Sequence, residues 1–462
     1  MRLRRLLPVA VLAVASAALP AQSAPSRLPL DLSGRATANV QPLAHFSTVG
    51  AGVSGAFLDK RTYVLSVADE AWNATNAPST VTGGLQVYDV SNAAKPVLQS
   101  TFPLPNFQNE DIALSGTRHF AVLSQDSFGT QGRVELVDLR NPKLPALLSV
   151  TSLPSGSGHT STLVDNDQYL WVSGAQSVVV VDVRDLTKPV VVGSFASPAG
   201  ERGPNGYVGV HDAEVDRFGD ISVFGSGGTA VYRTTKDPLE PALQARISKA
   251  DNTAIRNGLI HHGGKRLSKD LWLITEEDYS PGCKTDGAFE IWRIDRKAKL
   301  LRFVSMWDAP EGADDSGPLT QAEYCSSHWF TVNANNIVAD GWYGAGVRFL
   351  DVSDPKHIRP VGVWAGDSTT ASQAVFAPGS NDIVYVADYT RGLDVIKISN
   401  GGRGAKTVKP ADEKRVGSAT PAKTGLTIKV NFVPSKKWGW SCAVAQKTHQ
   451  DYAGTGSPLR VR

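Results

Sequence analysis

The chain has 462 residues, 41% of them hydrophobic, so it is long enough to bury a large core. Its 47 basic and 44 acidic side chains nearly balance, and the formal net charge of +3 gives no argument for nucleic-acid binding. The 43 Gly and 27 Pro supply many turns, a composition that favours a turn-rich β protein.

The first 24 residues have the three parts of a secretory signal peptide. Arginines lie near the start, an apolar run covers 6–19, and small residues follow at 21–24. Pro8 and Pro20 bracket the apolar run, which is shorter than the roughly 20 residues that a membrane-spanning helix needs. A membrane anchor is therefore the less favoured alternative. The sequence predicts export to the periplasm or the cell exterior, and a mature chain without a transmembrane anchor.

One pattern recurs along the chain and is clearest at 341–364, which reads GWYGAGVRFLDVSDPKHIRPVGVW. Alternation of apolar and polar residues up to Asp351 predicts one strand, and the run from Pro360 predicts the next. Between them Asp354 can accept a hydrogen bond from the backbone ahead, while Pro355 fixes φ and cannot donate to a sheet. The unit is therefore two strands joined by a turn.

Seven copies of this unit occur, at intervals of 44 to 60 residues. Such a period is typical of solenoids, propellers and repeat arrays rather than of two or three ordinary domains. The copies are anchored at Asp89, Asp138, Asp182, Arg233, Arg293, Asp351 and Lys397.

The strand-Asp-Val-Ser pattern followed by Pro-Val, seen at 88–97 and 350–361, resembles the LVIVD repeat of secreted or surface proteins of bacteria and archaea. The resemblance implies a β-propeller over about residues 40–400. It implies little about chemistry, because the repeat defines this family and a catalytic motif does not.

Each copy is preceded by two more predicted strands that are joined by a polar turn. These hairpins cover 57–68, 112–125, 162–175, 214–227, 264–277, 330–343 and 374–388. The predicted fold is therefore all-β, a seven-bladed β-propeller of four-stranded antiparallel blades. A long right-handed β-helix is the alternative, but its repeats are usually shorter.

The two ends of the repeat region complement each other. Residues 43–49 resemble the closing strand of a repeat that has no beginning, and the last repeat, GLDVIKI at 392–398, lacks a closing strand. We expect the N-terminal strand to complete the last blade, because this would remove two exposed sheet edges.

Composition divides the chain into five parts. They are the signal peptide at 1–24, an N-terminal lead at 25–41, the propeller at 42–400, a linker at 401–425 and a C-terminal tail segment at 426–462. The linker is predicted to be flexible because it is rich in Gly, Lys, Ala and Pro and has almost no large apolar residue.

Three cysteines are present, and an exported chain can hold disulfides. Cys283 and Cys325 lie in loops of neighbouring repeats, so a bridge between them is the favoured pairing, which leaves Cys442 over. The sequence alone does not fix that pairing.

Five of the nine histidines fall at the start of the predicted innermost strands. Counting back from equivalent positions of the second strands places His159, His211 and His261 in one column, and His262 and His328 in the next. Glu110 shares the first of these columns. Asp111 and Asp212 share the second.

Propeller symmetry would bring these side chains to one mouth of the central channel. Imidazoles together with carboxylates suit a divalent transition metal such as Cu or Zn. We expect His211, His261, His262 and His328 as ligands, with His159, Glu110, Asp111 and Asp212 as their partners or further ligands. For any one of these histidines, a hydrogen bond to a neighbouring carbonyl is the simpler explanation.

The His261-His262 pair is also similar to one in the seven-bladed propellers of the selenium-binding protein and methanethiol oxidase type, which carry histidines at a central copper site. The rest of that pattern is not matched here. Other acidic groups, at 276–278, 314–315 and Asp394, lack the spacing of a calcium loop and are interpreted as solvated loops.

Two classes of function remain. The favoured one is an exported, monomeric binding scaffold for a protein, glycan or small-molecule partner, with a metal or ligand site at the channel mouth. The alternative is a metal-dependent, copper-type enzyme of the cell envelope. No general acid, base or nucleophile is singled out by spacing, so no catalytic residue is assigned and the scaffold is preferred.

Overall fold

The computed structural model describes residues 32–48, 51–68, 83–104, 111–125, 131–204, 206–247, 260–278, 287–309, 325–417, 427–430 and 445–448. Within these ranges the chain is built of β-strands and three short 3-10 helices. The helices are η1 (Pro198–Gly200), η3 (Ser399–Gly402) and η4 (Pro410–Asp412).

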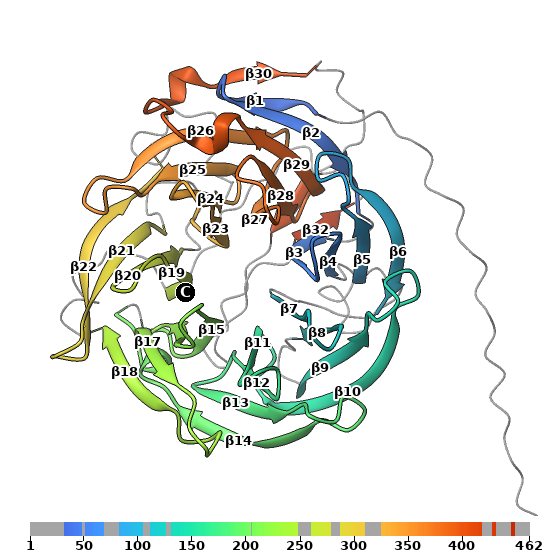
Figure 1. Ribbon diagram of the computed structural model, residues 1–462, viewed down its shortest axis with the longest axis vertical. Coiled ribbons are helices and arrows are strands. Elements are labelled where there is room, and N and C mark those ends of the chain that lie inside the picture. The colour runs from blue at the N-terminus through green and yellow to red at the C-terminus, as the bar shows by residue number, and fades with distance from the viewer. Residues whose placement is uncertain are drawn as a thin grey trace, which may run out of the picture. The chain divides into compact units, whose positions relative to one another are not determined.

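Three sheets are four-stranded antiparallel meanders that follow one another along the chain (Figure 1). The first contains β3 (Ala51–Phe57), β4 (Thr62–Ala68), β5 (Gly84–Asp89) and β6 (Val97–Pro103). The second contains β7 (Ile112–Ser115), β8 (Phe120–Gln125), β9 (Gln131–Asp138) and β10 (Ala146–Ser155). The third contains β11 (Ser161–Val164), β12 (Tyr169–Val172), β13 (Ser177–Asp182) and β14 (Val190–Ala196).

An eight-stranded sheet comes next and consists of two antiparallel four-stranded halves. The first half contains β15 (Val210–Val215), β16 (Ile221–Gly225), β17 (Gly228–Arg233) and β18 (Ala242–Ile247). The second contains β19 (Ile260–Arg266), β20 (Leu271–Glu277), β21 (Phe289–Asp295) and β22 (Leu300–Trp307). Among the described strands, pairing between the halves is limited to their outer strands, where β18 and β22 pair in parallel through Arg246–Leu300 and Ile247–Leu301.

Two sheets combine strands from both ends of the described chain. One contains β23 (Phe330–Val332), β24 (Ile337–Gly341), β25 (Val347–Asp351), β26 (Arg359–Gly366), β1 (Gly34–Ala36) and β30 (Lys414–Val416). The other contains β27 (Ala371–Phe376), β28 (Ile383–Asp388), β29 (Gly392–Ile398) and β2 (Val40–Phe46). Separately, β31 (Thr427–Val430) pairs with β32 (Ala445–Thr448).

The turn between the last two strands of a repeat forms as the sequence predicts. The carboxylates of Asp89, Asp138 and Asp351 each accept a hydrogen bond from the backbone N–H two residues ahead, at 2.8–2.9 Å. This local bond holds the chain in a turn in place of the sheet ladder. The repeat aspartate therefore ends one strand and positions the next.

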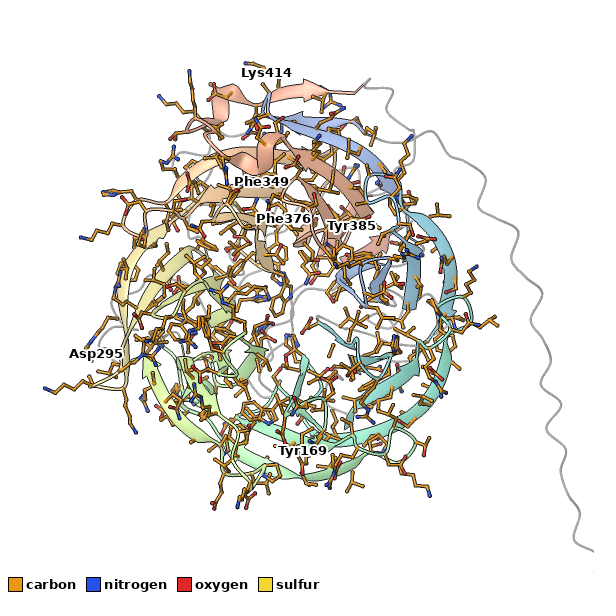
Figure 2. The ribbon with its side chains drawn as sticks, viewed as in Figure 1. Tyr169, Asp295, Phe349, Phe376, Tyr385 and Lys414 are labelled. Carbon is orange, nitrogen blue, oxygen red and sulfur yellow. The ribbon has the colours of Figure 1, made fainter. Side chains whose placement is uncertain are left out.

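The core lies between neighbouring sheets, which pack face to face. The rings of Phe349 on β25 and Phe376 on β27 lie 6.4 Å apart across one such contact (Figure 2). Tyr385 on β28 packs at 4.8 Å against Tyr63 on β4, which joins the last sheet to the first. The all-β architecture of a β-propeller is thereby confirmed.

The N-terminal strand completes the last sheet, as the sequence predicts. β2 pairs antiparallel with β29, from Val40 opposite Ile398 to Phe46 opposite Leu393. Val40 is buried in a core cluster with residues from two sheets, among them Val361 and Ile396. This pairing covers the edge of β29 and ties the two ends of the repeat region together.

The flexible linker predicted from residue 401 is wrong for residues 401–417. β30 pairs with β1, and the Glu413 carboxylate binds the guanidinium groups of Arg35 at 2.5 Å and Arg348 at 3.2 Å. The side chains of Glu413 and Arg348 are both 3% exposed. Composition misled the prediction because polar residues docked by ion pairs resemble a solvated tether.

Replacing Val40 by Asp should destabilise the whole repeat region, since a carboxylate would enter the core that closes it. We expect a loss of about 3 kcal/mol in the free energy of unfolding. Chemical denaturation measures it. Gln41→Glu on the exposed face of the same strand is the control and should change stability by less than about 0.5 kcal/mol. Equal stability of the two variants would contradict a closing role for β2.

Candidate metal centre

Four of the predicted histidines lie in a row, one from each of four successive inner segments. His211 and His262 belong to β15 and β19, while His159 and His328 precede β11 and β23. The ring centroids of His159 and His211 are 4.5 Å apart, those of His211 and His262 are 4.1 Å apart, and those of His262 and His328 are 3.7 Å apart. All four residues are fully buried.

Irregularities in the inner strands explain how these rings meet. The β15–β16 register shifts between Val210 and Asp212, and the β19–β20 register shifts between His261 and Gly263. His211 and His262 are thus the extra residues of two bulges, which turn a side chain out of the regular alternation. The two-column register is therefore wrong, and the four rings form a single row.

Backbone carbonyls fix two of the rings. His211 Nδ1 lies 2.9 Å from the carbonyl oxygen of His262, and His328 Nδ1 lies 2.6 Å from that of Ser372. Because a carbonyl only accepts, each Nδ1 carries a proton, and in the neutral form of either ring Nε2 presents a lone pair. His159 Nε2 is 2.9 Å from His211 Nε2 and therefore donates to it.

A carboxylate that the sequence analysis missed lies at the centre of the row. The Nε2 atoms of His211 and His262 lie 3.9 and 3.8 Å from Glu277 Oε2, and His328 Nε2 lies 3.7 Å from Glu277 Oε1. The Tyr343 hydroxyl donates a hydrogen bond to Glu277 Oε1. Glu277 itself is fully buried.

His262 is buried, but both of its ring nitrogens are available to bind a ligand. Neither of its ring nitrogens has a hydrogen-bond partner among the described residues. Burial, with a smaller contribution from His328, His211 and His159, holds the pKa of His262 well below its usual range. The ring is therefore neutral at pH 7, which is the form that binds a metal.

Aromatic rings shield the row. Trp329 packs against His262 with ring centroids 4.7 Å apart, and Tyr343 packs against His328 at 4.7 Å. Tyr389 stacks on Tyr343 at 6.1 Å. Such walls lower the local dielectric and strengthen any charge interaction at the nitrogens.

His261 does not join the row, so its grouping with the other three histidines is wrong. Its side chain lies with Glu276 and Glu290, where burial lowers the pKa of His261 to about 3 and raises that of Glu290 to about 8. The physical reason is the bulge at His262, which interrupts the regular alternation of β19 and sends the two histidines to different neighbours, while His261 keeps its regular partner Glu276.

Two of the three predicted acidic partners, Asp111 and Asp212, are among the described residues. Glu110 is outside the described residues. Burial, with a smaller contribution from Asp111, raises the pKa of Asp212 well above its usual range. Glu214 and Lys265 also act on the Asp212 carboxyl, and Lys265 forms an ion pair with Glu214 at 2.5 Å.

The interpretation of Glu276, Glu277 and Asp278 as a solvated loop is wrong. All three are buried, and the two glutamates end β20, where Glu276 lies opposite His261 and Glu277 opposite Ile260. Asp394 is also buried and accepts hydrogen bonds from Arg391 and Trp364 while it contacts His45, which makes it structural. Residues 314–315 lie outside the described ranges.

Cys325 is buried and disulfide-bonded. Cys283, its predicted partner, lies outside the described residues, and the pairing stays a prediction.

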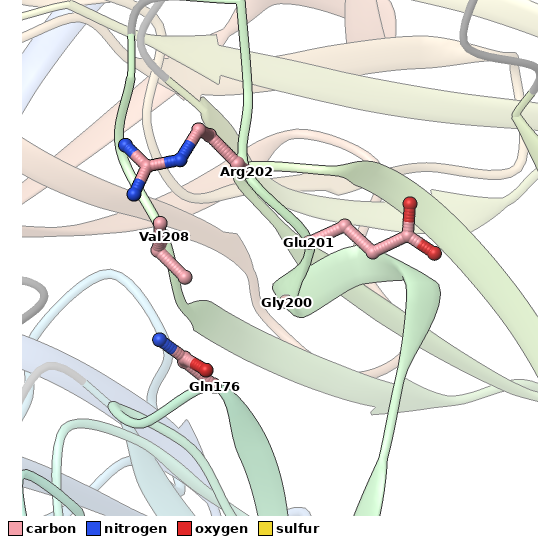
Figure 3. A pocket seen from close by; sticks show the side chains of 5 residues that line it. All are labelled: Gln176, Gly200, Glu201, Arg202 and Val208. Atoms are coloured by element: carbon pink, nitrogen blue, oxygen red, sulfur yellow. The ribbon is translucent and has the colours of Figure 1, made fainter.

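An open cavity of about 420 Å³ lies beside η1, away from the described imidazole contacts (Figure 3). It is lined by Gln176, Gly200, Glu201, Arg202 and Val208. Arg202 donates to the carbonyl of Gly206, and Glu201 lies 3.4 Å from Arg246, so these charges serve local structure. Within the described residues, no helix is long and apolar enough to cross a membrane.

Two regions of the chain match a known repeat family. The LVIVD repeat pattern matches residues 157–197 and 380–402. This chain carries LVIVD repeats. No curated protein sequence matches this chain.

Solved structures similar to this LVIVD-repeat chain share its fold at low sequence identity. A Lactobacillus plantarum protein is 9% identical, with 82% of this chain and 95% of that chain covered and a TM-score of 0.53. The periplasmic gluconolactonase of Pseudomonas aeruginosa is 12% identical, with 72% and 96% covered and a TM-score of 0.50. A Bacteroides fragilis protein described as a candidate 6-phosphogluconolactonase is 11% identical, with 79% and 97% covered and a TM-score of 0.53. These likenesses show the fold alone.

The depressed pKa of His262 predicts a pH dependence of stability. Below about pH 6.5 the unfolded chain binds a proton on this ring and the folded chain does not, so stability falls as pH falls. Each such histidine costs about 1 kcal/mol in the free energy of unfolding between pH 6.5 and 5.5. With a chelator present to remove metal, the free energy of unfolding of His262→Leu should fall over this interval by about that much less than that of the wild type. Urea unfolding at the two pH values measures the difference.

His357→Gln is the control, because the side chain of His357 is 75% exposed. It should keep the pH dependence of the wild type. If His262→Leu also kept it, the buried neutral ring would not be the source.

Proposed function

We propose that this chain is an exported binding protein that holds a divalent transition metal, Cu or Zn, at the row of buried histidines. The observation that carries the proposal is the group formed by His211, His262 and Glu277, whose ligand atoms all lie within 4.8 Å of one another. His159 and His328 extend the group on either side. Imidazole nitrogens with a carboxylate suit these metals.

The distances fit one ion. With bonds of about 2.0–2.1 Å, two ligands at right angles are about 2.9 Å apart and two on opposite sides about 4.2 Å apart. The separations from Glu277 to His211, His262 and His328 are 3.7–3.9 Å.

The surroundings also fit. Metal-binding histidines usually donate their other ring N–H to a carbonyl or carboxylate, which fixes the tautomer. His211 and His328 do so through Nδ1. The two unpartnered nitrogens of His262 are costly to bury, and a metal bond would offset that cost.

The blade count and the location belong to the same proposal. If each half of the eight-stranded sheet is one blade, the chain has seven blades, with β2 closing the last. Among the described strands, the halves pair only through the parallel β18–β22 contact, which supports this division. Export rests on the signal-like first 24 residues and on the resemblance to exported LVIVD-repeat proteins.

The scaffold role is supported by apolar side chains on outer strands. Val97 on β6, Val150 on β10 and Val190 on β14 are 61%, 51% and 56% exposed. A bound ion would add a Lewis-acidic or redox-active centre at the inner strands. Such a centre gives the propeller a ligand site in addition to its outer surface.

A copper-type enzyme is the second candidate, and Tyr343 is the observation that favours it. Its hydroxyl binds Glu277 and its ring packs on His328, so an oxidisable side chain touches two of the proposed ligands. Copper-loaded protein that consumed O₂ with methanethiol, and lost this activity in Tyr343→Phe, would favour the enzyme. Copper-loaded protein that lacked this activity would leave the binding scaffold as the proposed function.

Replacing both His262 and His328 by Ala should remove one bound metal ion and leave the fold intact. Purified protein is stripped with chelator, reloaded with Zn²⁺ or Cu²⁺, and measured by elemental mass spectrometry and calorimetry. We expect affinity at this site to fall by at least about 100-fold, because two ligands are lost. Tyr343→Phe keeps every ligand and should lower affinity by about 10-fold through Glu277.

His357→Ala is the matched control, since this exposed histidine should not affect binding. A double variant that retained the metal content of the wild type would exclude the site. A wild-type chain that bound no metal would do so as well.

A further inference from the structure

A second cluster lies on the opposite face of the strands that build the histidine row. His261 and Glu276 are Cα partners across β19 and β20, and each precedes a residue of the row. Glu290 joins them from β21. The side chains of His261, Glu276 and Glu290 are 2%, 4% and 0% exposed.

Their ligand atoms converge. His261 Nε2 lies 3.6 Å from Glu290 Oε2 and 4.0 Å from Glu276 Oε1, and the three ligand atoms all lie within 4.8 Å of one another. The two separations from His261 lie within the range for ligands around one ion, for which about 4.2 Å is the widest.

Neighbouring side chains hold the cluster in place. The Thr229 hydroxyl lies 2.8 Å from His261 Nδ1, and Trp292 Nε1 donates to Glu290 Oε2 at 2.7 Å. His261 is thus oriented through the ring nitrogen that faces away from the cluster, as metal-binding histidines usually are, and Trp292 holds the Glu290 oxygen that faces His261.

Two polar atoms remain unsatisfied. His261 Nε2 and Glu290 Oε1 are buried and have no hydrogen-bond partner among the described residues. A buried polar atom without a partner costs about 1–3 kcal/mol, so such atoms are rare and call for a ligand.

We propose that His261, Glu276 and Glu290 form a second divalent-cation site, separate from the histidine row. Its one imidazole and two carboxylates make a harder ligand set, which suits Zn²⁺ or Mn²⁺ better than copper.

The position of the site indicates a structural role. Thr229 lies on β17 in the first half of the eight-stranded sheet, while the three ligands lie on β19, β20 and β21 in the second half. The strand pairing between these halves is limited to β18 and β22. A cation that holds His261 against Thr229 would brace β19 against β17 and raise stability by mass action.

Metal stoichiometry tests the proposal on the full mature chain. After chelation and reloading with Zn²⁺, we expect about two ions per wild-type chain and about one in the near-isosteric Glu290→Gln. His261→Gln should also retain about one. With Mn²⁺ alone, the wild type should gain thermal stability and Glu290→Gln should lose that gain.

The outcomes separate this site from the histidine row. If Glu290→Gln loses one ion and the double alanine variant of His262 and His328 loses none, the result supports this site and rejects a metal site at the histidine row. Metal content and Mn²⁺ stabilisation that are unchanged in both Glu290→Gln and His261→Gln would overturn the proposal. If one variant fails to fold, Thr229→Val provides the test, since it removes only the partner of His261 Nδ1 and should weaken binding by about 10-fold.

Discussion

The pairing of β2 with β29 is the constraint on which the repeat region depends. It joins the N-terminal strand to the last repeat and leaves β29 without an open edge. Sheets held in this way cannot spread apart without breaking that ladder or an inter-sheet core. The inner strands therefore stay close enough for the rings of His262 and His328 to sit 3.7 Å apart.

Crowding of this kind determines the chemistry of the imidazoles. Rings packed together in a dry interior cannot share positive charge, and the pKa values of His211 and His262 are lowered by burial first and by neighbouring histidines second. Neutral rings need hydrogen-bond partners or a Lewis acid. Carbonyls satisfy one nitrogen each of His211 and His328, which leaves their Nε2 atoms directed at Glu277.

The sequence predicts the repeats, the closing strand and four members of the row, because strand alternation and turn aspartates are local signals. It does not predict which of His261 and His262 joins the row, since that depends on a bulge, and a shift of one residue exchanges the faces of a strand. Glu277 could have been predicted, because counting outward from the turn between β19 and β20 places 276–277 opposite the histidine pair. Tyr343 could not have been predicted, because it lies in a tight turn with φ of +40°.

The two glycines after the histidine pair show how packing and chemistry are linked at this point. A Cβ on Gly263 would lie 2.7 Å from the ring of Trp329, and one on Gly264 would lie 2.6 Å from the carbonyl oxygen of Leu273. Only glycine allows Trp329 to pack so closely over β19, and the same indole covers His262 at 4.7 Å. The segment His261 to Gly264 thus places one imidazole on each face and admits the neighbouring aromatic ring that keeps water from the His262 side.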